Sequence, residues 1–225
     1  MTLPLIYARS DSSRLPGKVL KKVQGTPLID IIFKRLSDCN VESPVLVTTS
    51  RIIDNDLVNY AEGQGYRVFR GNPFNLVERT REALDFFQPT SFLRVNGDSP
   101  FLDAKLINFT INTFPTYYFA SNLFHRTFPY GVSVELINTS FYIDSLCHVL
   151  SNECEHVTQH LYRYYPYKRF VSIIQNRDDS ALRLTIDTKK DYSHINSLFS
   201  QISLTSSYTS ALGLPSTCYS SSIIS

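Results

Sequence analysis

Long apolar runs, a secretory signal and a surplus of one charge are all missing from this chain. No apolar run approaches the roughly 18 residues that span a bilayer, and the first residues lack the regions of a signal peptide. We therefore expect a cytoplasmic protein that contacts no membrane. Its 22 lysines and arginines are interspersed with 20 acidic residues, so we expect no basic face for nucleic acid. Any anionic partner must be held locally.

A recognisable cysteine pattern is also missing. The four cysteines match neither a zinc site nor a disulfide framework, and we interpret them as thiols in a reducing compartment. They are Cys39, Cys147, Cys154 and Cys218. With 43% hydrophobic residues over 225 positions, the composition excludes collagen-like, coiled-coil and wholly disordered chains and predicts one globular domain.

The end of the chain has no charge at all. No Asp, Glu, Lys or Arg follows Asp191, and half of the residues in 202–225 are Ser or Thr. This composition is typical of a low-complexity tail. We expect a folded domain over residues 1–200 and a poorly ordered tail over 202–225 without packed elements.

The part of the chain before the tail alternates short apolar runs with amphipathic stretches. This alternation predicts an α/β fold, with βαβ units on a mostly parallel sheet flanked by helices. We expect helices around 28–36, 57–61, 77–87 and 106–114. We expect strands at 3–8, 44–50, 66–69, 91–95 and 182–186.

Three local signals refine this expectation. Thr26 and Pro27 have the form of an N-cap followed by proline at the first helical position. Thr188 and Asp191 have the form of a capping box that starts a helix after the last strand. The region of about 117–175 breaks the alternation, and we interpret it as an inserted substrate or dimerisation lobe.

A cationic loop follows the first predicted strand. Residues 8–18, ARSDSSRLPGK, contain Arg9, Arg14 and Lys18 beside a Pro-Gly turn. Ligands of open α/β sheets bind beyond the carboxyl ends of strands, and a polyphosphate would satisfy these cations and the free backbone N–H groups. The loop matches neither the Walker A nor the dinucleotide fingerprint. A solvated basic surface loop is an equally good interpretation of this segment alone.

Two acids also follow predicted strands. Asp98 comes after a strand and a glycine, and Asp187 comes directly after the strand predicted at 182–186. Carboxylate oxygens are suited to Mg²⁺, which is usually held by few carboxylates together with substrate phosphates. Each acid alone has an ordinary alternative, a turn aspartate for Asp98 and a helix N-terminal acid for Asp187. Together with the cationic loop they favour one nucleotide site.

Several ordered segments resemble one enzyme family. ARSDSSRLPGKVL is similar to the signature loop of the CMP-sugar synthetases, the acylneuraminate and 3-deoxy-manno-octulosonate cytidylyltransferases. The chain most resembles the spore-coat-polysaccharide F branch, in the same order over roughly residues 3–200. The further segments that carry the resemblance are FRGNPFNLVERTREAL, RVNGDSPFLD, RTFPYGVSVE, CEHVTQHLYR and LTIDTKKDY.

The resemblance implies a Rossmann-like, GT-A-like nucleotidyltransferase fold, often dimeric. It also implies an activity: transfer of CMP from CTP to an acidic 3-deoxy keto-sugar, with Mg²⁺ and release of pyrophosphate. In such a reaction a sugar hydroxyl attacks the α-phosphorus in line, and the protein mainly positions and neutralises charge. No general base is required.

The resemblance also assigns residues by position. The triphosphate loop corresponds to Arg9, Ser13, Arg14 and Lys18. The magnesium carboxylates correspond to Asp98 and Asp187. The segment near the cytidine corresponds to Arg70, Asn75, Glu78 and Arg79. The lobe that should meet the sugar contains Arg126, Glu135, Glu155 and His156.

The chain departs from the family at three places. Tyr7 stands where Gln or Pro is usual, Asp11 adds an acid to the phosphate loop, and residues 130–133 lack an aspartate common in the branch. These departures concern the acceptor more than the nucleotide chemistry. His156 is an alternative base, although a lone histidine in such a segment is more often structural or sugar-contacting.

Two other functions stay open at this point. A nucleotide-sugar glycosyltransferase would also bind Mg²⁺ and a nucleotide, but it normally needs a D-x-D motif, which is missing at the end of a central strand. A catalytically silent nucleotide-binding protein would fit the unusual tail. The silent protein is disfavoured by the presence of Arg14, Lys18, Asp98 and Asp187.

Overall fold

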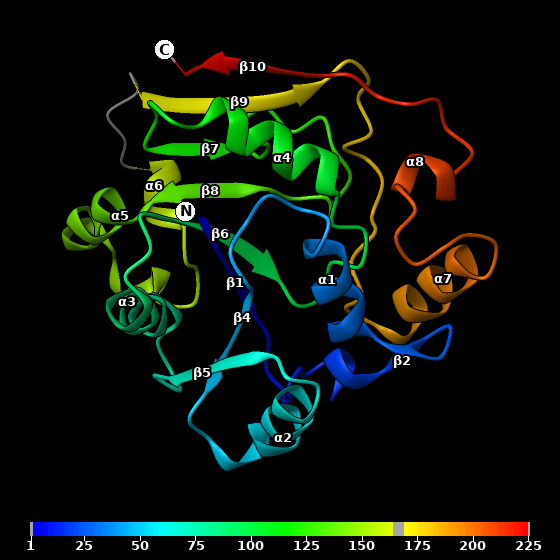
Figure 1. The fold of residues 1–225 in the computed structure, drawn as a ribbon, viewed down its shortest axis with the longest axis horizontal. Coiled ribbons are helices and arrows are strands. Elements are labelled where there is room, and N and C mark those ends of the chain that lie inside the picture. The colour runs from blue at the N-terminus through cyan, green and yellow to red at the C-terminus, as the bar shows by residue number, and fades with distance from the viewer. Residues whose placement is uncertain (1, 164–168, 225) are drawn as a thin grey trace.

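A twisted sheet of eight strands forms the centre of the molecule in the computed structural model. The structure describes residues 2–163 and 169–224. The strand order is β10-β9-β7-β8-β6-β1-β4-β5, and the four strands β6, β1, β4 and β5 are parallel (Figure 1). A short two-stranded sheet pairs β2 with β3. The strands are β1 Thr2–Tyr7, β2 Lys22–Val23, β3 Thr26–Pro27, β4 Val45–Thr49, β5 Arg67–Gly71, β6 Ser91–Asn96, β7 Phe119–Ser121, β8 Glu135–Asn138, β9 Phe170–Gln175 and β10 Tyr219–Ile223.

Helices cover both faces of this sheet (Figure 1). The helices are α1 Leu28–Leu36, α2 Asn55–Gly63, α3 Leu76–Phe87, α4 Ala104–Thr113, α5 Thr139–Ser145, α6 Gln159–Arg163, α7 Lys189–Phe199 and α8 Tyr208–Ala211. Single 3-10 turns complete the described elements. They are η1 Lys18–Leu20, η2 Ile52–Asp54, η3 Leu146–His148 and η4 Ser151–Glu153.

Two apolar cores form because successive side chains of a strand point to opposite faces. On one face Ile6 of β1 packs in a cluster with residues of α1, α2, α4 and α7. On the other face Leu3 and Leu5 pack with residues of α3, α5 and α6. The central strands β1 and β4 therefore begin with runs of buried, mostly apolar residues, as is usual for parallel strands covered on both sides. The alternation of strands and helices predicted from the sequence is confirmed for β1, α1, β4, α2, β5, α3, β6 and α4.

Two predicted details are wrong at element ends. Thr26 is not the N-cap of α1, because it pairs in β3 and the helix begins after Pro27 without a side-chain cap. Residues 182–186 do not form a sheet strand. Their backbone instead forms hydrogen bonds with Tyr130 and with Asp98. The apolar side chains of 182–186 are therefore buried by packing beside the sheet and not by pairing within it. The predicted capping box of Thr188 and Asp191 is confirmed.

The region 117–175 contributes three strands to the main sheet. β8 runs antiparallel to β6 and to β7, and β7 pairs in parallel with β9. The regular βαβ alternation breaks here because antiparallel neighbours need no crossover helix. The helices α5 and α6 lie at the end of the sheet near β8 (Figure 1).

The prediction that residues 202–225 contain no packed element is wrong. β10 pairs antiparallel with β9 over its whole length, and Tyr208 of α8 is only 1% exposed. The hydroxyl of Tyr208 lies 2.6 Å from Oε1 of Gln175 and 2.8 Å from Oδ2 of Asp179. An edge strand needs only backbone partners, so a Ser-rich segment can fill it once a few aromatic side chains anchor the approach.

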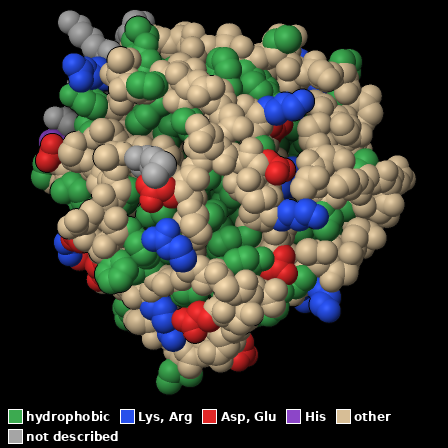
Figure 2. Space-filling model, viewed as in Figure 1, with side chains coloured by type: hydrophobic (Ala, Val, Ile, Leu, Met, Phe, Trp, Pro, Cys, Tyr) green, Lys and Arg blue, Asp and Glu red, His purple; other side chains and the backbone are tan. Residues whose placement is uncertain are grey.

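The surface agrees with the charge balance of the sequence. Figure 2 shows lysine, arginine and acidic side chains interspersed over the visible face, without a large patch of one sign. Within the described residues, no helix has both the length and the apolar composition needed to cross a membrane.

Candidate active site

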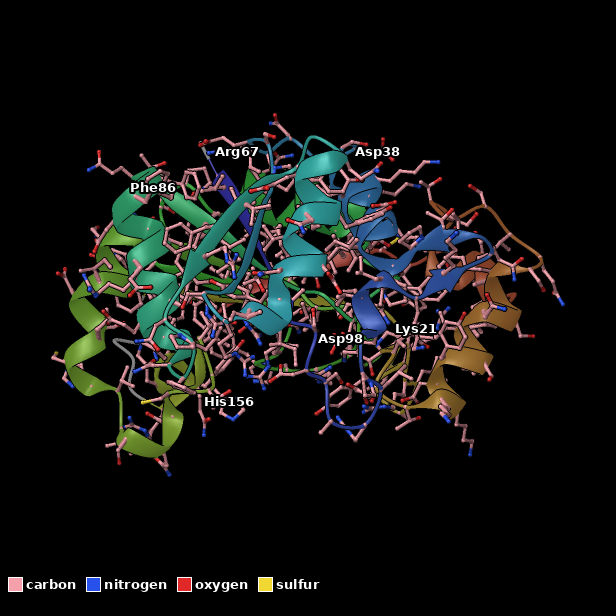
Figure 3. The ribbon with its side chains drawn as sticks, turned by 90° about the horizontal axis from the view of Figure 1, so that it is seen from below. Lys21, Asp38, Arg67, Phe86, Asp98 and His156 are labelled. Atoms are coloured by element: carbon pink, nitrogen blue, oxygen red, sulfur yellow. The ribbon has the colours of Figure 1, made fainter. Side chains whose placement is uncertain are left out.

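A cleft of about 320 Å³ opens at the carboxyl ends of β1 and β6. This is the edge of a parallel sheet at which ligands bind in open α/β proteins. Asp98, one of its lining residues, lies near the centre of the view in Figure 3. The cleft is lined by Tyr7, Ala8, Arg9, Ser12, Ser13, Arg14, Lys18, Val19, Leu76, Arg79, Asn96, Gly97, Asp98, Glu155 and Asp187.

The close approach of the β1 and β6 ends depends on Gly97. Its N–H donates to the carbonyl oxygen of Tyr7 at 2.9 Å. A Cβ atom at Gly97 would lie 2.7 Å from Cβ of Ala8 and 2.8 Å from that carbonyl oxygen. Only glycine fits this contact without a backbone shift. The start of the loop after β1 therefore packs directly against the segment that carries Asp98.

Lys18 joins the two acids singled out in the sequence. Its Nζ donates to Oδ2 of Asp98 at 2.9 Å and to Oδ1 of Asp187 at 2.9 Å. The two oxygens contact one nitrogen, so they cannot be farther apart than twice that distance. The backbone holds the same arrangement, because the N–H of Ile186 donates to the carbonyl oxygen of Asp98 at 2.9 Å. The convergence expected from the sequence is therefore present.

Asp187 is the most heavily contacted acid of the site. Its Oδ1 also lies 3.3 Å from Nη2 of Arg14, and its Oδ2 pairs with Arg183 and accepts from the hydroxyl of Thr185 at 3.2 Å. Burial alone would raise the pKa of this carboxyl, but the hydrogen bond and charge of Lys18, followed by Arg14, outweigh it and hold the pKa below its usual value. Asp187 is ionised at neutral pH.

The oxygens of the two carboxylates are the type of ligand that Mg²⁺ takes. No cluster of three or more His, Cys, Asp or Glu suited to a metal occurs within residues 2–163 and 169–224. Mg²⁺ does not need such a cluster, because it is commonly held by one or two carboxylates plus substrate phosphates and water. The ammonium group between Asp98 and Asp187 shows that their oxygens favour a cation at this point. The donor set thus fits a magnesium ion that arrives with a polyphosphate.

The remaining cations of the loop are placed at the mouth of the cleft. Arg9 contacts Asp11 at 3.3 Å and Glu155 at 3.7 Å, and the side chain of Arg14 is 63% exposed. Ser13 lines the same wall. The loop returns on itself through a hydrogen bond from the Gly17 N–H to the carbonyl oxygen of Ser10 at 2.9 Å. This wall presents positive charge and hydroxyl groups to the cleft, an arrangement that suits an anionic ligand.

A buried acid outside the loop fixes its conformation. Oδ1 of Asp54 accepts the N–H of Ser10 at 2.7 Å, and Oδ2 accepts the hydroxyl of Thr49. Nη1 of Arg51 donates to Oδ2 of Asp11 at 2.7 Å, and this hydrogen bond is the main reason that the pKa of Asp11 is lowered. Asp11, which departs from the family pattern, therefore joins the loop after β1 to the loop after β4.

The segment expected near the cytidine divides into two groups. Arg79 is buried, lines the cleft, and donates through Nε to the carbonyl oxygen of Asn72 at 2.8 Å. The others do not line the cleft. Arg70 donates to the carbonyl oxygens of Thr49 and Arg51, and two further residues act within α3, as Asn75 caps it and Glu78 pairs with Arg81.

The four residues expected to meet the sugar are also separated. Glu155 lines the cleft, whereas His156 is exposed and does not line it. Glu135 is 1% exposed, pairs with Arg94, and accepts the hydroxyls of Thr158 and Tyr162. Its contacts serve the packing of β8 against β6 and α6. Arg126 lies over the ring of Tyr130.

Two polar residues that contact the site were not predicted from the sequence. Asp54 lies in the turn η2 that follows β4, so the rule that selected Asp98 and Asp187 could have found it. Arg183 precedes Asp187 by four residues, but its pairing with that acid depends on the extended path of 182–186. No local pattern signals this path.

Comparisons with known proteins point to one family. A family model described as Cytidylyltransferase matches residues 3–210. The chain is similar to the spore coat polysaccharide biosynthesis protein SpsF of Bacillus subtilis, with 31% identity over 87% of this chain and 85% of that protein. It is 31% identical to a 3-deoxy-manno-octulosonate cytidylyltransferase of Fusobacterium nucleatum, over 50% of this chain and 45% of that protein. A solved structure of a cytidylyltransferase from Leptospira borgpetersenii shares 31% identity and a TM-score of 0.87, covering 95% of this chain and 93% of that one.

Proposed function

Because this chain belongs to the cytidylyltransferase family, we propose that it transfers CMP from CTP to an acidic sugar and releases pyrophosphate, as a step in surface polysaccharide synthesis. The family membership confirms the resemblance seen in the sequence. The chain is a nucleotidyltransferase with a Rossmann-like fold. The acceptor and the metal are parts of our proposal.

One observation carries the proposal. Lys18 lies between Asp98 and Asp187 at the end of a cleft whose wall is a cationic loop. A triphosphate needs cations along its length, and a metal-dependent reaction needs carboxylates at the reacting phosphate. Both requirements are met within a single cavity.

The residues of this cleft support an in-line displacement at the α-phosphorus. The attacking hydroxyl of the sugar releases its proton to solvent and forms the new P–O bond as the bond to pyrophosphate breaks on the opposite side. Lys18 and Arg14 neutralise the negative charge that grows on the leaving phosphates, which is the larger part of catalysis in such reactions. Mg²⁺ held by Asp98 and Asp187 would withdraw charge from the α-phosphate and lower the pKa of the attacking hydroxyl. Arg9 and Ser13 orient the chain of phosphates.

An acidic acceptor is favoured by the relatives and by the charge of the cleft. The relative from Fusobacterium nucleatum is named for 3-deoxy-manno-octulosonate, which carries a carboxylate. We assign Arg9, Arg14 and Lys18 to the phosphates, and the guanidinium group of Arg183 lies on the other side of Asp187. An acidic sugar would add a favourable charge interaction with these cations, which a neutral sugar cannot make.

The test is pyrophosphate release from CTP and Mg²⁺ with a panel of octulosonic and nonulosonic acids and matched neutral sugars. We expect release only when CTP and an acid are both present, and a product that contains CMP joined to the sugar. Lys18→Met should reduce the rate by about a hundredfold or more, whereas Lys22→Met, which alters an exposed lysine outside the cleft, should not. Release with neutral sugars and none with acids would refute the proposal.

A further inference from the structure

Every carboxylate oxygen of Asp98 and Asp187 already accepts from a donor of this chain. Lys18 donates to one oxygen of each acid, Oδ2 of Asp98 and Oδ1 of Asp187, at 2.9 Å. The hydroxyl of Ser99 donates to the other oxygen of Asp98 at 3.1 Å. The other oxygen of Asp187 pairs with Arg183. A metal ion therefore gains these oxygens only when some of their donors leave.

The negative charge of the two acids is also more than neutralised. Lys18, Arg14 and Arg183 bring three positive charges within ion-pair distance of the two carboxylates, an excess of one. A divalent cation that joined this set alone would be repelled by the three cations. A triphosphate carries several negative charges and gives these cations new partners. The charge balance thus favours a metal ion that binds together with a polyphosphate over a metal ion that binds alone.

Lys18 is the donor that bridges the two acids, and its side chain is 12% exposed. Its backbone is fixed, because its N–H donates to the carbonyl oxygen of Leu15 at 3.2 Å and the next residue, Val19, is 1% exposed. The four-carbon stem of a lysine rotates freely, so the ammonium group can move while the backbone stays in place. Lys18 lines the same cleft as Ser13 and Arg14. A triphosphate in this cleft would offer the ammonium group new acceptors.

We propose that Lys18 blocks metal binding to Asp98 and Asp187 until a nucleotide binds. The triphosphate attracts the ammonium group away from the two carboxylates, and the oxygens that it leaves then accept the metal ion. The free chain has little affinity for the metal, because the metal must displace Lys18 without an alternative partner for its charge. This inference rests on the proposed use of CTP. It gives Lys18 a regulatory role in addition to its proposed contact with the leaving phosphates.

The first experiment measures Mn²⁺ binding in the absence of nucleotide. Mn²⁺ takes the same oxygen ligands as Mg²⁺, and the free ion is quantified by electron paramagnetic resonance. We expect Lys18→Met to lower the dissociation constant for Mn²⁺ by about tenfold or more, because no ammonium group competes for the carboxylates. Lys18→Gln also removes the charge and should act in the same direction, which provides a second variant if one of them does not fold. Adding Asp98→Asn to Lys18→Met should abolish the gain.

Lys22→Met is the matched control for this experiment. Lys22 is exposed and does not line the cleft. Its replacement removes the same unit charge from the chain, but salt screens exposed charges, so the dissociation constant for Mn²⁺ should change by less than about twofold. Equal gains in Lys22→Met and Lys18→Met would mean that net charge controls metal binding, and would overturn the inference.

The second experiment follows the ammonium group itself by nuclear magnetic resonance. The signal of the Lys18 NH₃⁺ group is assigned by its loss in Lys18→Met. The probe is a CTP analogue with a methylene group between the α- and β-phosphates, added without metal. We expect the analogue to shift the Lys18 signal and to leave that of Lys22 unchanged. An unchanged Lys18 signal with the analogue bound would overturn the inference.

The outcomes separate this inference from the proposed function. If the chain releases pyrophosphate with an acidic sugar, and Lys18→Met and Lys18→Gln bind Mn²⁺ no more tightly than the unmodified chain, the block is wrong and the proposed function stands. If no acceptor supports pyrophosphate release, while the Lys18 variants gain affinity for Mn²⁺ and the analogue shifts the Lys18 signal, the proposed transfer fails and the block stands.

Discussion

Replacing Asp54 with alanine removes an anchor of the loop after β1, to which we assign the triphosphate. The side chain is fully buried, accepts the N–H of Ser10 at 2.7 Å and the hydroxyl of Thr49, and lies 3.7 Å from Nη2 of Arg51. A hydrogen bond to a charged group contributes about 1.5–3 kcal/mol. Two are lost in Asp54→Ala, so we expect the free energy of unfolding to fall by about 3 kcal/mol or more.

The effect on the ligand follows from the Ser10 contact. Without it, the backbone between Arg9 and Lys18 loses a fixed point, and bound CTP must order it. We expect the affinity for CTP with Mg²⁺ to fall by about tenfold, since ordering one or two residues costs about 1–2 kcal/mol each. Asp54→Asn should be milder, because its amide oxygen can still accept from Ser10 while its NH₂ donates to Thr49.

Calorimetry with CTP and urea unfolding followed by circular dichroism measure the two effects. The chain has no tryptophan, so a fluorescence signal would come from tyrosine. Asp56→Ala is the matched control, since that acid is exposed in the first turn of α2 and should contribute only about 0.3–1 kcal/mol. If folded Asp54→Asn and Asp54→Ala both bind CTP as tightly as the unmodified chain, the loop does not depend on this anchor.

Three further predictions concern catalysis, pH and the C-terminal segment. Lys18→Ala and Asp98→Ala should each reduce turnover by about a hundredfold or more, and a near-normal rate in either folded variant would remove that residue from the mechanism. Burial lowers the pKa of His160 to about 4. The neutral imidazole therefore contributes fully to stability above the unfolded pKa near 6.5, and this contribution is lost as the pH falls towards 4. Between these two pH values the free energy of unfolding should fall less steeply in His160→Gln than in the unmodified chain. The same dependence on pH in both proteins would contradict the assignment. Tyr208→Phe should lower the free energy of unfolding by about 0.5–1.5 kcal/mol, because its hydroxyl hydrogen bond to Gln175 is lost; an unchanged value would mean that α8 is not held by this contact.

The sequence was sufficient for the fold around β1, β4, β5 and β6 and for the location of the site. Parallel strands covered on both faces are read directly from continuous apolar runs, and strand ends gather at one edge of the sheet. Lys18, Asp98 and Asp187 could be selected by this rule although 80 and 169 residues separate Lys18 from the two acids. Their bonding through one ammonium group confirms the expected convergence, while their roles in the reaction stay predictions.

The residues that escaped prediction depend on tertiary contacts. Glu135 belongs by position to the lobe expected to meet the sugar, yet its carboxylate is enclosed by Arg94, Thr158 and Tyr162. Only the pairing of β8 with β6 brings Arg94 beside it. A position within a motif therefore did not indicate whether the side chain faces the cleft or the core.

The segment 182–186 explains both a wrong prediction and the geometry of the site. Its apolar pattern reports burial correctly, as Leu184 and Ile186 are 1% and 0% exposed, but burial alone does not specify which backbone it pairs with. Had it joined the sheet as a strand, its N–H and C=O groups would have been used by a neighbouring strand. Because the segment runs beside the sheet, its backbone groups form hydrogen bonds with Tyr130 and Asp98 instead. This path brings Asp187 within hydrogen-bond distance of Lys18. A proline at Ile186 would remove the N–H that bonds to Asp98, so we expect Ile186→Pro to impair turnover more than Ile186→Val, which keeps the backbone donor and most of the buried volume.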